Sequence, residues 1–195
     1  MPADSGGELL VVAFGGTRAD GTRYVTGELV AGGSGASTAK DGVDGIETDA
    51  TNCMNLPAEA LELDAPIRVH RVALRRDSGG AGTQRGGLGV VREYEILHGE
   101  VRFTHRGERH YIAPKGRAGG GDGAMAQTTI LRADGRRETV PSKLVTALAA
   151  GDRVVFETAG GGGYGDPTRR DPEQVRGDLL DGKISPAGAG QYARR

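Results

Sequence analysis

Residues 77–97 read DSGGAGTQRGGLGVVREYEIL, a segment with six glycines in its first thirteen positions and an apolar run directly after them. Residues 90–97 alternate between apolar and polar side chains, which is the pattern of a strand with one buried face. Glycine-rich stretches beside such runs are typical of turns, bulges and close approach of two backbones. Because 35 of the 195 residues are glycine and no collagen period is present, the chain is predicted to be a β protein with ordered glycine turns.

Alternating runs on both sides of this segment predict further strands. Turn-forming pairs separate neighbouring runs at positions 20–21, 98–99 and 134–135, and such pairs favour antiparallel hairpins. A polar, glycine-rich loop and one helical turn near Pro57 are expected between the second and third runs. The predicted strands are residues 9–14, 23–30, 67–75, 90–97, 100–106, 127–132, 143–149 and a run that contains Val154 and Val155.

The last thirty residues have a different character. Asp171 can cap a helix that starts at Pro172, and Ser185 before Pro186 favours a second short helix. The predicted fold class is therefore mainly β with some α (α+β). We expect an antiparallel glycine-rich β body over 1–165 and a short C-terminal helical tail over 166–195.

Composition argues against several classes of function. With 25 basic and 26 acidic side chains the net charge is −1, so no strong field favours nucleic acid or an anionic membrane as a partner. A single cysteine, Cys53, excludes an internal disulfide framework. No leader segment or membrane-length apolar run is visible, so a cytoplasmic location is expected.

Two local patterns resemble binding sites, and for each of them a purely structural interpretation is favoured. Gly160, Gly162 and Gly165 have the spacing of a dinucleotide-binding loop, but Asp166 and Pro167 intervene before any helix, so a packed glycine turn is favoured. No Walker-type loop occurs. The second pattern is a cluster of basic side chains: Arg102, His105, Arg106, Arg109 and His110. It is interpreted as a solvated strand face, and the histidines of the chain are interpreted as exposed or locally bonded.

The segment 77–89 leaves two interpretations open. Its backbone N–H groups could form an anion-binding nest in which Arg85 holds a carboxylate. Alternatively, Asp77 and Arg85 could form an internal ion pair that braces a wide turn. Ser78 lacks the flanking residues of a nucleophile elbow and no base can be assigned to it.

A compact polar set, made of Asn52, Asn55, Glu59 and Glu62, surrounds Cys53. Its members either cap the helical turn at Pro57 or point into a pocket whose other wall belongs to another chain. With Arg85, three of them make the substrate-lining candidates: Asn52, Asn55 and Glu59. No spacing of histidines and carboxylates indicates a metal site in this chain, and no catalytic residue is assigned.

Several glycine-rich motifs, in this order, resemble the C-terminal portion of the hydantoinase B/oxoprolinase family. The likeness covers nearly the whole chain. The motifs are GGSGA at 32–36, DGVDG at 41–45, NCMNLPAE at 52–59, the segment 77–89, PKGRAGG at 114–120, GDRV at 151–154 and GGGGYGDP at 160–167. Lys115 departs from the aromatic or apolar residue expected after Pro114.

The resemblance implies an ATP-dependent hydrolase of cyclic amides, with carboxylation of a ketone as the alternative reaction. ATP would be handled by a hydantoinase A-type subunit, and a divalent metal by a hydantoinase B-type N-terminal portion, so this chain alone is expected to bind neither. It would be a split subunit, a truncated product or an excised piece, inactive alone, that lines a composite active site. A non-catalytic docking subunit is the other open alternative.

Overall fold

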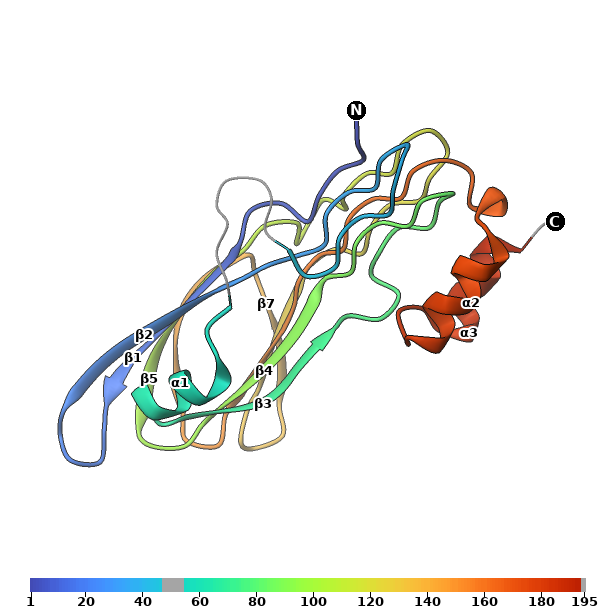
Figure 1. Cartoon of the computed structure of the whole chain (residues 1–195). Coiled ribbons are helices and arrows are strands. Elements are labelled where there is room, and N and C mark those ends of the chain that lie inside the picture. Colours follow the sequence, from blue (N-terminus) through green and yellow to red (C-terminus); the bar gives the residue numbers. More distant parts are fainter. Residues whose placement is uncertain (47–54, 194–195) are drawn as a thin grey trace.

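The computed structural model describes residues 1–46 and 55–193, and their fold is a sandwich of two antiparallel sheets (Figure 1). The first sheet has the order β2-β1-β5-β8, built from Arg23–Val30, Leu10–Thr17, Glu100–Arg106 and Lys143–Ala149. The second has the order β3-β4-β9-β6-β7, built from Ile67–Leu74, Val90–Ile96, Arg153–Glu157, Gln127–Leu131 and Arg137–Val140. The predicted α+β, mainly β class is confirmed.

The alternating runs locate all strands except β7. Arg137–Val140 has only four residues, with two charged side chains among them, so its alternation is too short to read. Its pairing with β6 and its place at the sheet edge make it a strand. Strand β1 continues past Phe14 to Thr17 because Gly15 to Thr17 pair with the start of β2.

Aromatic side chains fill the space between the two sheets. The Phe14 ring centroid lies 5.3 Å from that of Phe103 and 5.6 Å from that of Tyr94. Phe156 closes the group from the second sheet, 5.4 Å from Tyr94. These four rings are fully buried, and tilted or edge-on pairs at such distances are favourable. The core is therefore set by inward-facing positions of both sheets.

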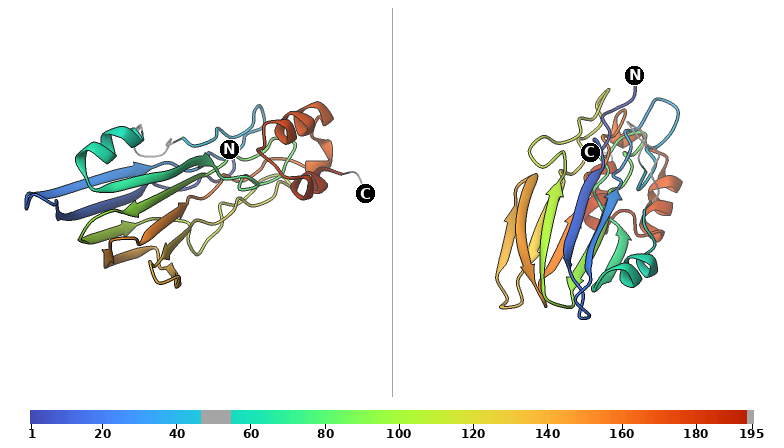
Figure 2. Two further views of the ribbon diagram at one scale, coloured as in Figure 1. Left: turned by 90° about the horizontal axis from the view of Figure 1, so that it is seen from below. Right: turned by 90° about the vertical axis from the view of Figure 1, so that its left-hand side faces the viewer.

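At one end of the sandwich the strands run on into a layer of extended segments, which we call the glycine bundle (Figure 1). It consists of residues 3–6, 32–45, 78–89, 114–124 and 159–165. These segments bond to one another through their backbones. Gly33 N donates to Ala159 O at 2.9 Å, Gly161 N to Gly87 O at 2.8 Å, and Gly87 N to Ser34 O at 2.9 Å. Figure 2 shows the same segments side by side from two further directions.

The bundle requires glycine because its backbones lie too close for a side chain. A Cβ on Gly161 would lie 1.9 Å from Ser34 O, and one on Gly33 would lie 2.0 Å from Gly87 O. A Cβ on Gly80 would lie 2.1 Å from Gly121 O. Such overlaps are far inside van der Waals contact. The glycines thus allow hydrogen-bonded backbones to pack without side chains between them.

Short helices complete the fold. Helix α1, Ala58–Asp64, packs on β2 and β3. The tail contains α2, Pro172–Leu180, and α3, Pro186–Ala189, each capped as predicted: Asp171 accepts from Glu173 N and Ser185 accepts from Gly188 N. No helix in the described residues is long and apolar enough to cross a bilayer. The division at residue 165 and the cytoplasmic location stay predictions.

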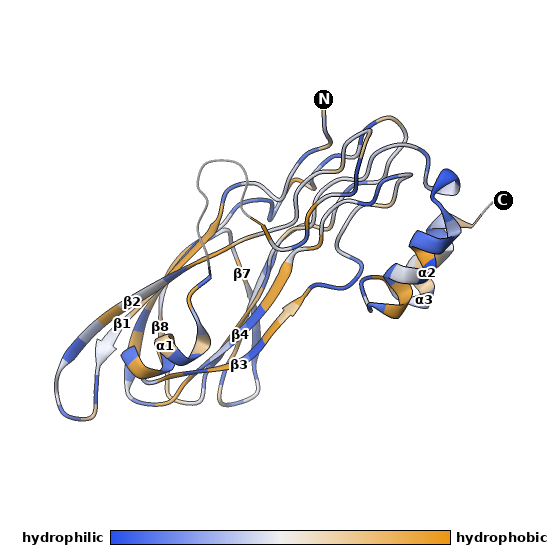
Figure 3. Cartoon of the chain, in the orientation of Figure 1, coloured by the Kyte–Doolittle hydropathy of each residue, from blue (hydrophilic) through white to orange (hydrophobic). Residues whose placement is uncertain are grey.

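The tail rests on the glycine bundle through a second, small apolar cluster. Ala81 of the bundle packs with Ile184 and Tyr192 of the tail. Figure 3 shows apolar positions on the tail helices next to polar ones, as expected of helices with one covered side. This cluster is separate from the aromatic core of the sandwich.

Candidate functional site

The structure does not bring the substrate-lining candidates into one pocket. Asn55 is exposed just before α1, and Glu59 is exposed in the first turn of that helix. Arg85 lies in the glycine bundle against the tail, at the opposite end of the molecule from α1 (Figure 1). Asn52 and Cys53 lie outside the described residues. The part of the set that is described is therefore split between an open surface and a buried position.

Arg85 is an internal ion-pair residue. Its side chain is 2% exposed, and its Nη1 lies 3.1 Å from Asp44 Oδ1 while its Nε lies 3.3 Å from Asp178 Oδ2. The proposed pair with Asp77 is wrong, because the Asp77 carboxylate instead accepts from Ser185 N at 2.8 Å. An internal brace is thus present, with different partners.

A second buried arginine joins this arrangement. Arg170 Nη2 lies 2.6 Å from Asp41 Oδ2 and 2.8 Å from Asp178 Oδ2, so Asp178 of α2 bridges both guanidinium groups. We call this group the arginine–aspartate cluster; its members are Asp41, Asp44, Arg85, Arg170 and Asp178. It links two loops of the bundle to the tail. Sequence analysis missed the roles of Arg170 and Asp178, which no local pattern marks.

The charges in this cluster are stabilised by one another. Burial opposes the charge of Asp44, but the hydrogen bond from Leu88 N and the pairing with Arg85 outweigh it and hold the pKa of Asp44 below its usual value. Burial likewise raises the pKa of the nearby Tyr192 hydroxyl to about 12. The cluster therefore acts as a lock between tail and bundle, through ion pairs that join Asp41 and Asp44 of the bundle to Asp178 of α2 by way of the two arginines.

The nest interpretation of residues 77–89 does not fit the hydrogen bonding. Gly80 N donates to Gly161 O, Gly86 N to Gly80 O, and Leu88 N to the Asp44 carboxylate. These N–H groups are occupied within the protein and cannot cradle an anion. Ser78 is also structural, because its buried Oγ donates to Arg75 O and accepts from Gly89 N.

The loop at 160–165 is a packed glycine turn, as predicted. Gly161, Gly162 and Gly163 donate their N–H groups to Gly87 O, Asp4 O and Gly121 O. A short 3-10 helix follows at Pro167–Arg169, so no helix N-terminus faces this loop as a nucleotide site requires. The family-like motifs at 77–89 and 160–167 thus serve the bundle.

A second buried ionic group lies beneath the segment that carries Asn55. Glu28 of β2 accepts from the Arg92 guanidinium, from the Tyr94 hydroxyl and from Leu56 N, and Arg92 also donates to Leu56 O. Burial dominates and raises the pKa of Glu28 above its usual value, although the bonds from Tyr94 and Arg92 oppose this. The group fixes the backbone next to Asn55 and thereby the start of α1.

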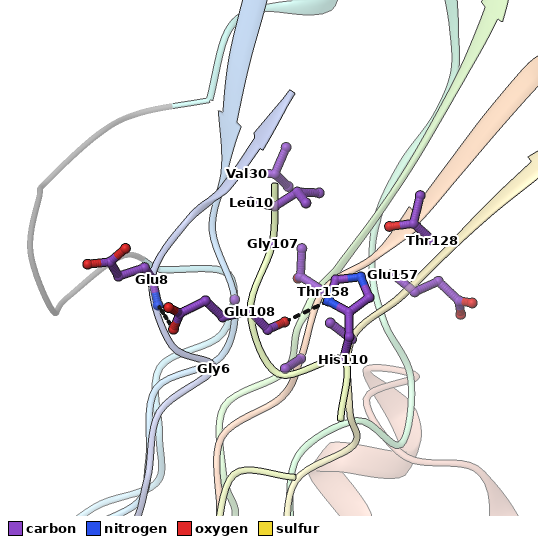
Figure 4. A pocket seen from close by; sticks show the side chains of 13 residues that line it. Gly6, Glu8, Leu10, Val30, Gly107, Glu108, His110, Thr128, Glu157 and Thr158 are labelled. Atoms are coloured by element: carbon purple, nitrogen blue, oxygen red, sulfur yellow. Dashed lines mark hydrogen bonds between the residues drawn. The ribbon is translucent and has the colours of Figure 1, made fainter. Parts of the chain in front are cut away.

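A partly open pocket where sandwich and bundle meet is too small for an organic substrate (Figure 4). Its volume of about 10 Å³ matches roughly one water molecule. Glu8, Glu108, His110 and Glu157 are among the residues that line it. His110 Nδ1 donates to Glu108 O, so the neutral ring carries its lone pair on Nε2.

His105 corrects the interpretation of the basic cluster. Arg102 and Arg106 are exposed as predicted, but His105 is 3% exposed and stacks on Phe156 with ring centroids 5.9 Å apart. Burial, together with the neighbouring His110, lowers the pKa of His105 to about 4. Alternation along β5 turns this histidine inward between Arg102 and Arg106.

No metal centre is visible within residues 1–46 and 55–193: no three His, Cys, Asp or Glu side chains there lie where they could hold an ion. The carboxylates at the buried positions already pair with arginines, as in the arginine–aspartate cluster. The described side chains thus include the arginine–aspartate cluster, the ionic group around Glu28, and an exposed surface around Asn55 and Glu59.

Comparison with known proteins gives one consistent family. Residues 1–167 match the family model described as hydantoinase B/oxoprolinase. The chain is 37% identical to the B subunit of a putative D-/L-hydantoinase from Pseudomonas sp. strain NS671, over 92% of this chain and 30% of the relative. It is 33% identical to the beta subunit of the caprolactamase from Pseudomonas jessenii, over 88% of this chain and 31% of the relative.

Solved structures agree in fold. An ATP-dependent caprolactamase from Pseudomonas jessenii matches with a TM-score of 0.76 and 27% identity, over 98% of this chain and 35% of that chain. A nucleotide-free acetone carboxylase matches with a TM-score of 0.81 over 96% of this chain and 30% of that chain; at 19% identity this likeness shows the fold alone. The chain spans about a third of the length of these relatives.

Proposed function

Because this chain belongs to the hydantoinase B/oxoprolinase family, we propose that it works as one part of an ATP-dependent hydrolase of cyclic amides and is inactive alone. The observation that carries the proposal is the 37% identity to a hydantoinase B-type chain across 92% of this chain but only 30% of the relative. The similarity to the beta chain of a caprolactamase supports the same reaction class. The remaining machinery then belongs to other polypeptide.

The proposed partners are a hydantoinase A-type subunit that handles ATP and a hydantoinase B-type N-terminal portion that carries a divalent metal. Two features of the described residues support this division: glycine N–H groups of the bundle bond internally, and the carboxylates of Asp44 and Asp178 pair with arginines. The steps that use ATP or metal are therefore assigned to the partner polypeptides. The proposed contribution of this chain is to position the substrate and stabilise charge.

Within that role, the substrate-lining candidates differ in whether they are exposed or buried. Asn55 and Glu59 are exposed at the start of α1 and can present an amide and a carboxylate to a polar ring. Asn52 belongs to the same proposed set by sequence. Arg85 acts from a buried position and would affect the pocket through the arginine–aspartate cluster.

Two alternatives remain in view. A ketone carboxylase is favoured only by the acetone carboxylase likeness, which reaches the fold and not the sequence. A non-catalytic docking subunit would need the exposed surface around Glu59 to have no effect on turnover. The sequence relatives favour the hydrolase.

Reconstitution with the proposed partner chains tests the proposal. Glu59→Gln is expected to reduce amide hydrolysis at least about tenfold while the complex still assembles, because the carboxylate orients substrate. Leu63→Ala, at an exposed site on the same helix, is the matched control. Unchanged turnover of an assembled Glu59→Gln complex would favour the docking alternative. Turnover by the isolated chain would overturn the proposal.

A further inference from the structure

The outer faces of both sheets carry charged side chains. On the β3-β4-β9-β6-β7 sheet some of them are paired: Arg153 Nη1 lies 3.2 Å from Glu93 Oε1, and His70 Nε2 lies 2.5 Å from Glu95 Oε2. Pairs of this kind satisfy a surface that faces water. The exposed Arg68, Arg71 and Arg137 of the same sheet have no ion-pair partner among the described residues.

The outer face of the β2-β1-β5-β8 sheet has an apolar centre made of small side chains. Buried residues such as Phe14, Tyr24 and Phe103 fix the inward positions, so their neighbours point outward. Strand pairing aligns the outward positions in two rows across all four strands. The rows are Gly27, Ala13, Thr104 and Val145, and Val25, Gly15, Arg102 and Ala147.

This centre is open and hollowed. Val25 is 80% exposed and Val145 is 59% exposed. A shallow hollow of about 490 Å³ lies over Gly15, with Glu100, Arg102 and Ala147 in its wall. Since glycine and alanine leave little above the backbone, another polypeptide could approach the sheet closely. Exposed β-branched side chains beside such a hollow are typical of an interaction site.

Basic side chains lie within and around the apolar centre. Arg23, Arg102 and Lys143 have no ion-pair partner among the described residues, and Arg106 reaches only the exposed Glu8, at 3.4 Å. Glu100 is the acidic side chain on the same outer surface. The face therefore has an excess of positive charge.

We propose that this face, which we call the docking face, packs against an acidic, flat surface of the larger hydantoinase B-type polypeptide. Its members are Ala13, Gly15, Val25, Gly27, Arg102, Val145 and Ala147. The proposal rests on the proposed function, since the relatives are about three times as long as this chain and their remaining residues must meet it somewhere. Unpaired cations around an apolar centre select an acidic partner.

A second copy of this chain is a poorer occupant. In a two-fold symmetric contact the same surface meets itself, so the basic rim would face an equally basic rim. Like charges placed together at an interface oppose association. The partner that fits is therefore a different surface with acidic side chains.

Binding of the assembled partner chains to this chain tests the docking face. Val145→Glu and Val25→Glu place carboxylates on exposed positions and are expected to weaken binding at least about tenfold, because they bury an unpaired charge. Val72→Glu on β3 is the matched control, since Val72 is 54% exposed on the other sheet. Higher salt should weaken wild-type binding as well. Equal binding of all three variants would overturn the proposal.

A photo-crosslinking residue at position 145 identifies the occupant in the native assembly. The expected product joins position 145 to an acidic segment of a hydantoinase B-type chain, while position 72 gives no such product. A crosslink to a second copy, or none in an active, assembled complex, would overturn the docking face and leave the proposed function standing. Recovery of this chain without any hydantoinase-family partner would overturn both.

Discussion

The sandwich and the glycine bundle are stabilised in opposite ways. In the sandwich, large rings such as Phe14, Phe103 and Phe156 fill the space between sheets, and the backbones bond only within each sheet. In the bundle, backbones bond directly to neighbouring segments and a Cβ on Gly161 would meet Ser34 O at 1.9 Å. The difference shows that a buried layer can be specified by the absence of side chains as strictly as by their presence.

The largest effect is expected for Gly161→Ala. The added methyl would overlap a carbonyl oxygen on a backbone that its neighbours hold in place, so we expect a loss of at least about 4 kcal/mol in the free energy of unfolding, or failure to fold. Denaturant unfolding measures it. Gly177→Ala is the matched control: nothing lies within 4 Å of that site on α2, and it should stabilise by about 0.5–1 kcal/mol. Tolerance of Gly161→Ala would mean that the bundle is looser than its contacts indicate.

Removing a ring from the sandwich should have a comparable but smaller effect. Phe156→Ala leaves a cavity between Tyr94 and Phe103, and we expect a loss of about 3–5 kcal/mol. Phe156→Leu, which keeps most of the volume, should lose less. A loss below about 1 kcal/mol for Phe156→Ala would show that the core collapses onto the gap. Denaturant midpoints of the two variants decide this.

Removing a member of the arginine–aspartate cluster, which joins the bundle to the tail, should cause the next largest loss of stability. Asp178→Ala leaves Arg85 and Arg170 without their shared carboxylate, and breaking a buried pair in this way costs about 3 kcal/mol. In Asp178→Ala, hydrogen exchange of the α2 amides should become faster than in the wild type, while exchange of the sandwich strands should not. That result would show local release of the tail. Asp181→Ala, on the exposed end of α2, is the control. Equal exchange in both variants would contradict the lock.

The smallest effect concerns the dependence of stability on pH through the buried His105. The pKa of His105 is lowered from 6.5 to about 4, so the folded protein favours the neutral ring. The unfolded chain binds a proton first, and this contribution to stability, complete above about pH 6.5, is lost as the pH falls towards 4. His105→Phe keeps an aromatic ring against Phe156 and should flatten the fall of the urea midpoint over that range. His98→Gln, at an exposed turn, should retain the wild-type slope.

Local patterns predicted most strands and both tail caps because short-range sequence periods and capping chemistry act within a few residues. They missed β7, whose four residues are a strand only through pairing with β6. They also misplaced His105 and the partner of Arg85. Ion-pair partners such as Asp178 lie 93 positions away in the chain, and no spacing in the sequence marks them.

By itself the sequence determined an antiparallel β protein with a helical tail, since alternation, turn dipeptides and capping residues are local properties. It also carried the family likeness, because the order of glycine motifs is written in the chain. Only the tertiary structure decided that those glycines form one hydrogen-bonded layer, that Arg85 is buried, and that small apolar side chains gather with cations on the outer face of the β2-β1-β5-β8 sheet. Each of these depends on which distant segments meet, and that is set by the packing of the whole chain.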